Sequence, residues 1–239
     1  PLAMGCSNAD VFRINRSDSS VFLKVLSKTS NESLEDEARI LQWLENKISV
    51  PMMLDAGTDG DFKYLLISAI KGHDCVELLE TLKPTRMVEL LAEGLRSIHE
   101  LDSSECPFNQ TLDSKLAAAA RNIESDFVDE SDFDPERLGM TKEAVYQNLL
   151  RDRPAEADMV FNHGDYCLPN ILLNGYRVSG FVDLGRAGIS ARYNDLAIAS
   201  RSIGSNLGPQ YEDIFFKAYG LSQVDRELIQ YYRMLDELF

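Results

Sequence analysis

Hydrophobic and polar positions alternate along several stretches of the first 70 residues, a pattern typical of β-strands. Residues 9–14 (ADVFRI) and 20–26 (SVFLKVL) are rich in β-branched and aromatic side chains. The polar segment between them, residues 15–20 (NRSDSS), predicts a turn. Residues 50–70 predict two further strands around a glycine-containing turn. Four strands are therefore expected in this part of the chain.

A helical period separates the two pairs of strands. In residues 31–47 the leucines and alanines recur every three or four positions, which places them on one face of a helix. Asn31 and Ser33 stand just before this run, and both residue types are favoured at helix N-termini. The first part of the chain therefore predicts a sheet with one helix.

From residue 84 onward helical periods dominate. Pro84 stands where proline is favoured, at the first position of a helix. The predicted helices cover residues 84–101, 111–127, 141–152, 191–203 and 222–239. Among them, residues 170–174 and 177–185 predict a short hairpin.

These elements predict an α+β fold with two lobes. A small β-rich N-lobe takes residues 1–72, with a hinge at residues 68–72, and a larger, mainly helical C-lobe takes residues 73–239. A chain of 239 residues can bury a sizeable core. Its 44% hydrophobic and 26% charged residues are ordinary for a globular protein in water.

Composition excludes several classes of protein. No apolar run approaches the length of a membrane span and no signal peptide opens the chain, so we expect a cytoplasmic protein. The opening PLAMGCSNAD reads like a truncation. The four cysteines are scattered without a CxxC pair, and the chain has only three histidines. We therefore expect no structural zinc site, and we expect the cysteines to be reduced thiols.

The chain is strongly acidic. It carries 39 Asp and Glu against 24 Lys and Arg, for a formal net charge of −15. Nucleic-acid binding needs a basic surface, so no nucleic-acid partner is expected. An acidic surface would instead steer a cationic partner inward. Acidity also serves solubility alone, so charge by itself does not identify the partner.

The segment HGDYCLPN, residues 163–170, carries the clearest chemistry. Asp165 follows a glycine in a predicted loop, where its carboxylate could act as a general base. Asn170 ends the loop, and Asp183 follows thirteen residues later at the end of the next predicted strand. An amide oxygen and a carboxylate brought together across a hairpin suit Mg²⁺. With a carboxylate that accepts a hydroxyl proton, they form a phosphoryl-transfer site.

The alternative is that these residues only shape turns. For either aspartate alone, a turn carboxylate is the better interpretation, and Asn170 alone could cap a strand. The ordered set of His-Gly-Asp, an asparagine five residues on and Asp-Leu-Gly after it is more specific. We therefore favour the functional hypothesis.

The N-lobe offers the other half of such a site. Period-two alternation places Phe22 and Lys24 on one face of a strand, where a ring can cover an adenine and a lysine can reach phosphates. Glu37 in the following helix could pair with Lys24 and hold its ammonium in place. Ser7, in the turn Gly-Cys-Ser, could present a hydroxyl and backbone amides to phosphates. A lysine on a strand, taken by itself, is more often a solvated residue than a phosphate ligand.

Taken together, these residues resemble the aminoglycoside 3'-phosphotransferases, a bacterial resistance family with a protein-kinase-like fold. The resemblance covers essentially the whole chain. Its most specific stretches are HGDYCLPNILL, SGFVDLGRAGISARYNDLA and YYRMLDELF.

The resemblance implies a role for each matching residue. Asp165 corresponds to the catalytic aspartate, and Asn170 and Asp183 correspond to Mg²⁺ ligands. Lys24 corresponds to the lysine that contacts phosphates, with Glu37 as its helix partner.

Further nucleotide contacts follow from the same resemblance. Phe22 replaces the ring that stacks on adenine, and Ser7 lies in the nucleotide-positioning loop. The backbone of Ser68 and Ile70, at the hinge, is expected to hold the adenine edge.

The family also implies an acidic pocket for the drug. The residues that match its lining are Asp132, Asp134, Arg186, Arg201, Glu237 and the carboxylate of Phe239. The alternative for the segment DESDFDPE, residues 129–136, is a solvated acidic loop, and the sequence alone does not decide between the two.

The chain departs from the family in two places. Ala191 occupies a position that is aspartate in many relatives, and Ser205 and Asn206 replace an acidic pair found in some members. Both leave the drug spectrum open. The chain also starts roughly twenty residues later than its relatives, which would cost an edge strand.

The resemblance therefore implies a Mg²⁺-dependent kinase that uses ATP or GTP to phosphorylate the 3'-hydroxyl of a cationic aminoglycoside. Two alternatives stay open: a kinase of choline or a sugar on the same fold, and a nucleotide-binding pseudokinase. We expect no membrane partner, and a monomer or a weak dimer.

Overall fold

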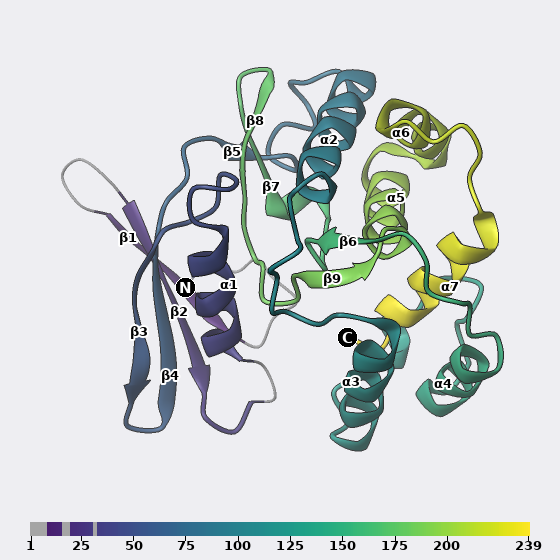
Figure 1. The fold of residues 1–239 in the computed structure, drawn as a ribbon, viewed down its shortest axis with the longest axis horizontal. Coiled ribbons are helices and arrows are strands. Elements are labelled where there is room, and N and C mark those ends of the chain that lie inside the picture. Colours follow the sequence, from purple (N-terminus) through teal and green to yellow (C-terminus); the bar gives the residue numbers. More distant parts are fainter. Residues whose placement is uncertain (1–8, 16–19, 31–32) are drawn as a thin grey trace.

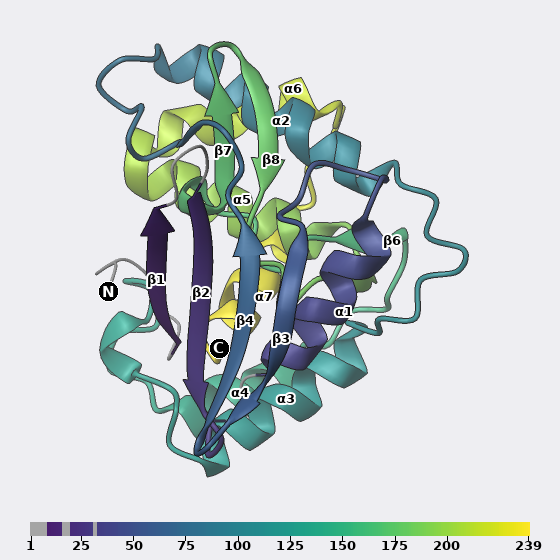
Figure 2. The same ribbon diagram turned by 90° about the vertical axis from the view of Figure 1, so that its left-hand side faces the viewer.

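A computed structural model describes residues 9–15, 20–30 and 33–239. In it, four antiparallel strands form a sheet with the order β1-β2-β4-β3 (Figure 2). The strands are β1 (Asp10–Asn15), β2 (Ser20–Ser27), β3 (Met53–Asp59) and β4 (Phe62–Ser68). All four strands were predicted, and β2 lies inside the sheet, paired with both β1 and β4.

Helix α1 (Leu34–Leu44) packs against this sheet (Figure 1). Its buried side chains include Leu34, Leu41 and Leu44, which confirms the predicted helical face. The Ser33 side chain accepts a hydrogen bond from the backbone N–H of Asp36 at 3.1 Å, so Ser33 is the N-cap. The other proposed cap residue, Asn31, lies outside the described residues.

Six helices of the described residues form the bulk of the second lobe (Figure 1). They are α2 (Pro84–His99), α3 (Leu112–Glu124), α4 (Lys142–Arg151), α5 (Tyr193–Leu207), α6 (Glu212–Tyr219) and α7 (Arg226–Asp236). Five were predicted, and Pro84 is the first residue of α2 as expected. Helix α6 was missed because it has only 8 residues, too few to establish a period.

Two small sheets hold the loop that carries the candidate chemistry. The predicted hairpin is β7 (Ile171–Asn174) and β8 (Arg177–Phe181), with β5 (His73–Asp74) on its edge. Strand β6 (Met159–Asn162) pairs with β9 (Gly188–Ala191), and neither of these was predicted. Single turns of 3-10 helix lie at Glu130–Asp132, Leu168–Asn170 and Pro209–Tyr211.

The loop between α1 and β3 is tied to the hairpin at Ser49. Its hydroxyl donates to the carbonyl of Ser179 at 2.6 Å, and its own carbonyl accepts from the N–H of Phe181 at 3.0 Å. A side chain at Gly180 would start 2.8 Å from the Ser49 carbonyl oxygen, so the two segments meet at their backbones. The division of the lobes at residue 72 stays a prediction. In the part of the chain that the structure describes, every helix is too short or too polar to span a membrane.

The cap of α1 gives a first test. Replacing Ser33 by alanine leaves the N–H of Asp36 without its side-chain acceptor. We expect the free energy of unfolding to fall by about 1 kcal/mol. Urea denaturation measures it, with Ser222→Ala at an exposed position as the control. Equal stabilities of the two variants would contradict the assignment of Ser33 as a cap.

Candidate active site

The predicted catalytic loop begins at the end of β6 and passes close to the backbone of Arg186. Gly164 has a φ of +88°, in the region that favours glycine. A Cβ atom there would lie 2.0 Å from the carbonyl oxygen of Arg186. Only glycine therefore allows the loop to pass this point, and Asp165 follows immediately.

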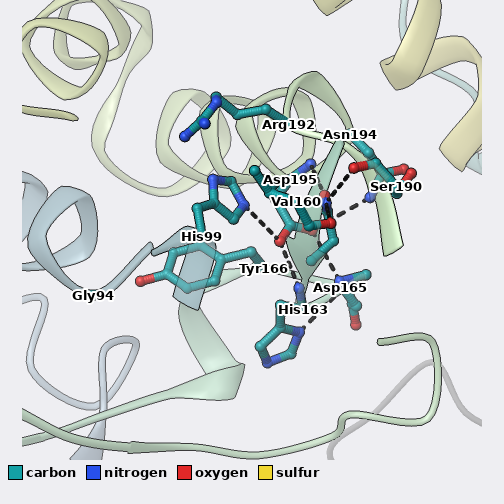
Figure 3. Close-up of polar contacts among 12 residues, drawn as sticks. Gly94, His99, Val160, His163, Asp165, Tyr166, Ser190, Arg192, Asn194 and Asp195 are labelled. Carbon is teal, nitrogen blue, oxygen red and sulfur yellow. Dashed lines mark hydrogen bonds and ion pairs between the residues drawn. The ribbon is translucent and has the colours of Figure 1, made fainter. Parts of the chain in front are cut away.

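The buried carboxylate of Asp195, on α5, holds the backbone of this loop (Figure 3). Its Oδ2 accepts from the N–H of His163 at 2.6 Å and its Oδ1 accepts from the N–H of Gly164 at 2.9 Å. The ring of His99 also lies at Oδ2, with Nε2 at 3.3 Å. Burial alone would raise the pKa of Asp195, but these contacts outweigh it and hold the pKa below its ordinary value.

The same network continues away from the loop. The Nδ1 atom of His99 lies 2.7 Å from the hydroxyl of Tyr219, on α6. Arg192 donates to that hydroxyl and forms an ion pair with Asp158 at 2.6 Å. Helices α2, α5 and α6 thus share one chain of polar contacts. None of these residues was singled out from the sequence, because a buried framework residue has no signal that separates it from an ordinary one.

Two side chains orient the carboxylate of Asp165. The Nδ2 atom of Asn170 donates to the Asp165 carbonyl at 3.0 Å and to its Oδ2 at 2.9 Å. Arg186 reaches Oδ1 at 3.3 Å. The Asp165 side chain keeps 27% of its surface exposed, so a substrate can approach it. The five-residue spacing of the sequence motif therefore lets Asn170 hold Asp165.

Asn170 and Asp183 lie at the same end of the hairpin. Ile171 pairs with Phe181 in the ladder, so the residues just outside the two strands adjoin. The N–H of Val182 donates to the carbonyl of Asn170 at 3.0 Å. Asp183 follows with a φ of +60°, a turn conformation that aspartate tolerates better than most residues, and its side chain is 44% exposed.

Lys24, on β2, connects the first lobe to this end of the hairpin. Its Nζ lies 2.7 Å from Glu37 on α1 and 2.8 Å from Oδ1 of Asp183. The predicted pair of Lys24 and Glu37 is confirmed as a contact. Burial alone would lower the pKa of Lys24, but the two carboxylates outweigh it, so its pKa is raised and it is charged at neutral pH.

The two carboxylates of this triad differ. Burial raises the pKa of Glu37, although Lys24 opposes the shift. Partial burial acts in the same direction on Asp183, but the charge of Lys24 prevails and its pKa is lowered. Asp183 is also the more exposed of the two, with 44% of its side chain exposed against 5% for Glu37, so it faces the open side.

The oxygen atoms at the hairpin end fit a magnesium ion. The amide nitrogen of Asn170 faces Asp165, which leaves its oxygen for a ligand, and one oxygen of Asp183 binds Lys24. Mg²⁺ prefers such hard oxygens and takes phosphate and water for its remaining positions. In the described residues, His, Cys, Asp and Glu nowhere gather in threes to form a metal site of their own.

The other proposed nucleotide contacts lie along the first sheet and the hinge. Phe22 faces the same side of β2 as Lys24, and the guanidinium of Arg13 lies 6.0 Å from its ring centre. Ser68 ends β4 and accepts a hydrogen bond from Met52 at 2.9 Å. Ile70 packs against Gly180. The remaining candidate, Ser7, lies outside the described residues, and the roles of all four in nucleotide binding stay predictions.

Next to Asp165, Asp236 joins two arginines, and it was not singled out from the sequence. It contacts Arg186 at 3.5 Å and Arg201 at 3.3 Å. Arg201 also binds Asp134 at 2.9 Å. Burial raises the pKa of Asp236, and Arg186 opposes the shift. Three proposed pocket residues, Arg186, Arg201 and Asp134, are therefore joined through Asp236 in one network of alternating charges.

The other proposed pocket residues differ in whether they are free to contact a substrate. Glu237 is buried and both of its carboxylate oxygens have partners, because one binds Arg137 at 2.6 Å and the other accepts from the N–H of Asp134 at 2.8 Å. It positions Asp134 in this structure. Asp132 is exposed and its carbonyl lies 3.5 Å from Arg201. Phe239 is 42% exposed, and the Arg186 guanidinium lies 5.5 Å from its ring centre.

This arrangement has counterparts in known proteins. A model of a phosphotransferase enzyme family matches residues 1–235, and the chain belongs to that family. It is 40% identical to the aminoglycoside 3'-phosphotransferase of Niallia circulans, over 91% of this chain and 83% of that protein. The enzyme of the same name from Streptomyces ribosidificus is 34% identical, over 98% and 93% of the two chains.

Solved structures agree with this assignment. The aminoglycoside-3'-phosphotransferase of type VIII superposes with a TM-score of 0.89 at 32% identity, over 100% of this chain and 92% of that one. An aminoglycoside phosphotransferase from Streptomyces rimosus, solved with ADP and streptomycin, gives a TM-score of 0.80 at 25% identity, over 98% and 94%. The predicted family and the predicted α+β, protein-kinase-like fold are confirmed.

The anchor at Asp195 gives a second test. Asp195→Asn removes a charged acceptor of two backbone N–H groups, so we expect a loss of about 1.5–3 kcal/mol in the free energy of unfolding at pH 7. The native pKa is lowered, so this stability is present above the ordinary aspartate pKa of about 3.9 and is lost as the pH falls through the lower native value.

The measurement is urea denaturation from pH 7 to pH 3. The difference between wild type and Asp195→Asn should shrink only below about pH 4. Asp59→Asn, at the exposed last residue of β3, is the control and should differ little from wild type. A difference that is absent at pH 7 would contradict the anchoring role.

Proposed function

We propose that this protein transfers the γ-phosphate of ATP or GTP to the 3'-hydroxyl of an aminoglycoside antibiotic and so confers resistance. The observation that carries the proposal is the grouping of Asp165, Asn170 and Asp183 at one end of the β7–β8 hairpin, with Lys24 reaching it from the other lobe. The names of the relatives support the same acceptor.

Asp165 is the proposed catalytic base. Asn170 and Arg186 hold its carboxylate in one orientation while part of it stays exposed. In the proposed reaction it positions the acceptor hydroxyl and accepts its proton as the oxygen attacks the γ-phosphorus. The nucleoside diphosphate is the leaving group. Most of the acceleration comes from positioning and from neutralising charge.

Lys24 is the proposed phosphate ligand. Glu37 holds its ammonium from the side of α1, so the charge is fixed without the nucleotide. Asn170 and Asp183 would hold Mg²⁺, which would neutralise charge on the phosphates when bound. The backbone groups of Ser68 and Ile70 and the ring of Phe22 are the proposed contacts of the nucleotide base.

The acceptor side is proposed to recognise ammonium groups. Asp134 and Asp236 each bind arginines in this structure, and a polycation could exchange for part of those contacts. The exposed Asp132 and the terminal carboxylate at Phe239 are further proposed contacts. A neutral sugar would gain nothing from these charges, so the network favours an aminoglycoside over a sugar.

An assay of nucleoside diphosphate release separates the candidate functions. It compares aminoglycosides, choline and a neutral hexose, each with ATP and with GTP. The proposal expects release only with aminoglycosides. Release with choline or the hexose alone would favour the metabolite kinase, and binding of nucleotide without release would favour the pseudokinase.

Asp165→Asn tests the proposed base. We expect kcat to fall by about 10²- to 10⁴-fold, because the carboxylate no longer accepts the hydroxyl proton. The nucleotide Kd, measured by calorimetry, should stay within a few-fold of wild type, since Asp165 is not among the proposed phosphate ligands. A variant with near-normal kcat would rule out this role.

Asp236→Asn tests the acceptor side. Loss of the carboxylate leaves two arginines facing the cationic substrate, so the aminoglycoside KM should rise by about 10-fold or more. The nucleotide KM should change less, and added salt should weaken aminoglycoside binding in the wild type. Glu227→Gln, exposed on the same helix, is the control. If both variants keep the wild-type KM, Asp236 is not part of the pocket.

A further inference from the structure

Lys115, on α3, is a buried cation that the proposed mechanism does not use. The residue is only 4% exposed. None of the described carboxylates forms an ion pair with it, whereas an ammonium taken out of water normally has such a partner. Its position therefore needs another explanation.

The last side chain of the protein lies close to this ammonium. The Nζ atom lies 5.6 Å from the centre of the Phe239 ring, within the range of a cation–π contact. The guanidinium of Arg186 lies 5.5 Å from the same ring. Burial and the charge of Arg186 lower the pKa of Lys115 to about 8, although the charges of Asp195, Asp236 and Asp165 oppose the shift.

A second residue of α3 holds the preceding peptide. The Nδ2 atom of Asn122 donates to the carbonyl of Leu238 at 2.9 Å. Asn122 follows Lys115 by seven residues, about two helical turns, so both side chains project from one face of α3. Figure 1 shows the C-terminus beside this helix.

We propose that Lys115 and Asn122 of α3 form a clamp for the C-terminal dipeptide Leu238–Phe239, and that the clamped ring of Phe239 positions Arg186 beside Asp165. The clamp is made by positioning residues and contacts no reacting atom. The part that concerns substrate binding rests on the proposed function. The part that concerns the C-terminus does not.

The burial of Lys115 also predicts how its replacement affects the stability of the fold. A residue kept only for stability should destabilise the fold when it is replaced. Removal of a buried ammonium that forms no direct ion pair removes its desolvation cost but also its attraction to Asp195, Asp236 and Asp165, so global stability should change little. The clamp therefore predicts a looser C-terminus in a protein of similar stability.

Release of Phe239 by carboxypeptidase A measures the clamp without any substrate. Lys115→Gln should release the terminal phenylalanine about 2- to 30-fold faster than wild type, the range of a cation–π contact. Lys115→Arg, which keeps the charge, should restore slow release. Arg121→Gln, at an exposed position of α3, is the matched control and should behave as wild type. Urea denaturation checks that the variants are equally folded.

Steady-state kinetics test the link to the site. Lys115→Gln should raise the aminoglycoside KM at least threefold and leave the nucleotide KM within twofold. In a Phe239→Leu background the same substitution should have no further effect, because the clamp acts through the ring. Additive effects in this cycle would overturn the role of Phe239.

The remaining outcomes are also decisive. If Lys115→Gln does not fold, Asn122→Ala should accelerate release of Phe239, and unchanged release would overturn the clamp. Unchanged release from folded Lys115→Gln would overturn it as well. If the wild type acts on no aminoglycoside, the proposed function fails, while the rate of Phe239 release still decides whether the clamp exists.

Discussion

The site depends on one buried carboxylate. Asp195 binds the N–H groups of His163 and Gly164, so the backbone just before Asp165 cannot shift independently of α5. His99 fixes the same carboxylate from α2. The position of Asp165 is thus set by helices of the core and not by the loop itself. The proposed catalytic role of Asp165 needs this rigidity, because small displacements of a catalytic group are costly in rate.

Around this anchor the charges alternate in sign. Lys24 lies between Glu37 and Asp183 on the proposed nucleotide side, and on the proposed acceptor side Arg186 lies between Asp165 and Asp236. Each of these charged groups therefore has a partner of opposite charge within the protein before a substrate binds. In the proposed function, entry of the nucleotide and of the polycation would exchange these internal partners for substrate groups.

The sequence predicted the helices and strands that have a clear hydrophobic period and the site residues that belong to a motif. Most helices and the strands of the first sheet followed from spacing, and the loop motif predicted which residues would gather at the hairpin end. Strands β6 and β9 have 4 residues each and were too short to show alternation. Asp195 and Asp236 were missed because their roles arise from contacts between distant segments. Burial likewise gave Glu237 a positioning contact that its charge alone did not indicate.

The proposed function places the phosphate on the 3'-hydroxyl, and phosphorus–proton correlation NMR of the product identifies the oxygen that carries it. After reaction of wild-type protein with ATP and an aminoglycoside, the account predicts one phosphorus signal that correlates with the proton at the 3' position. The 3'-deoxy analogue of the same drug should yield no phosphorylated product. Phosphate at another hydroxyl, or phosphorylation of the 3'-deoxy analogue, would contradict the account.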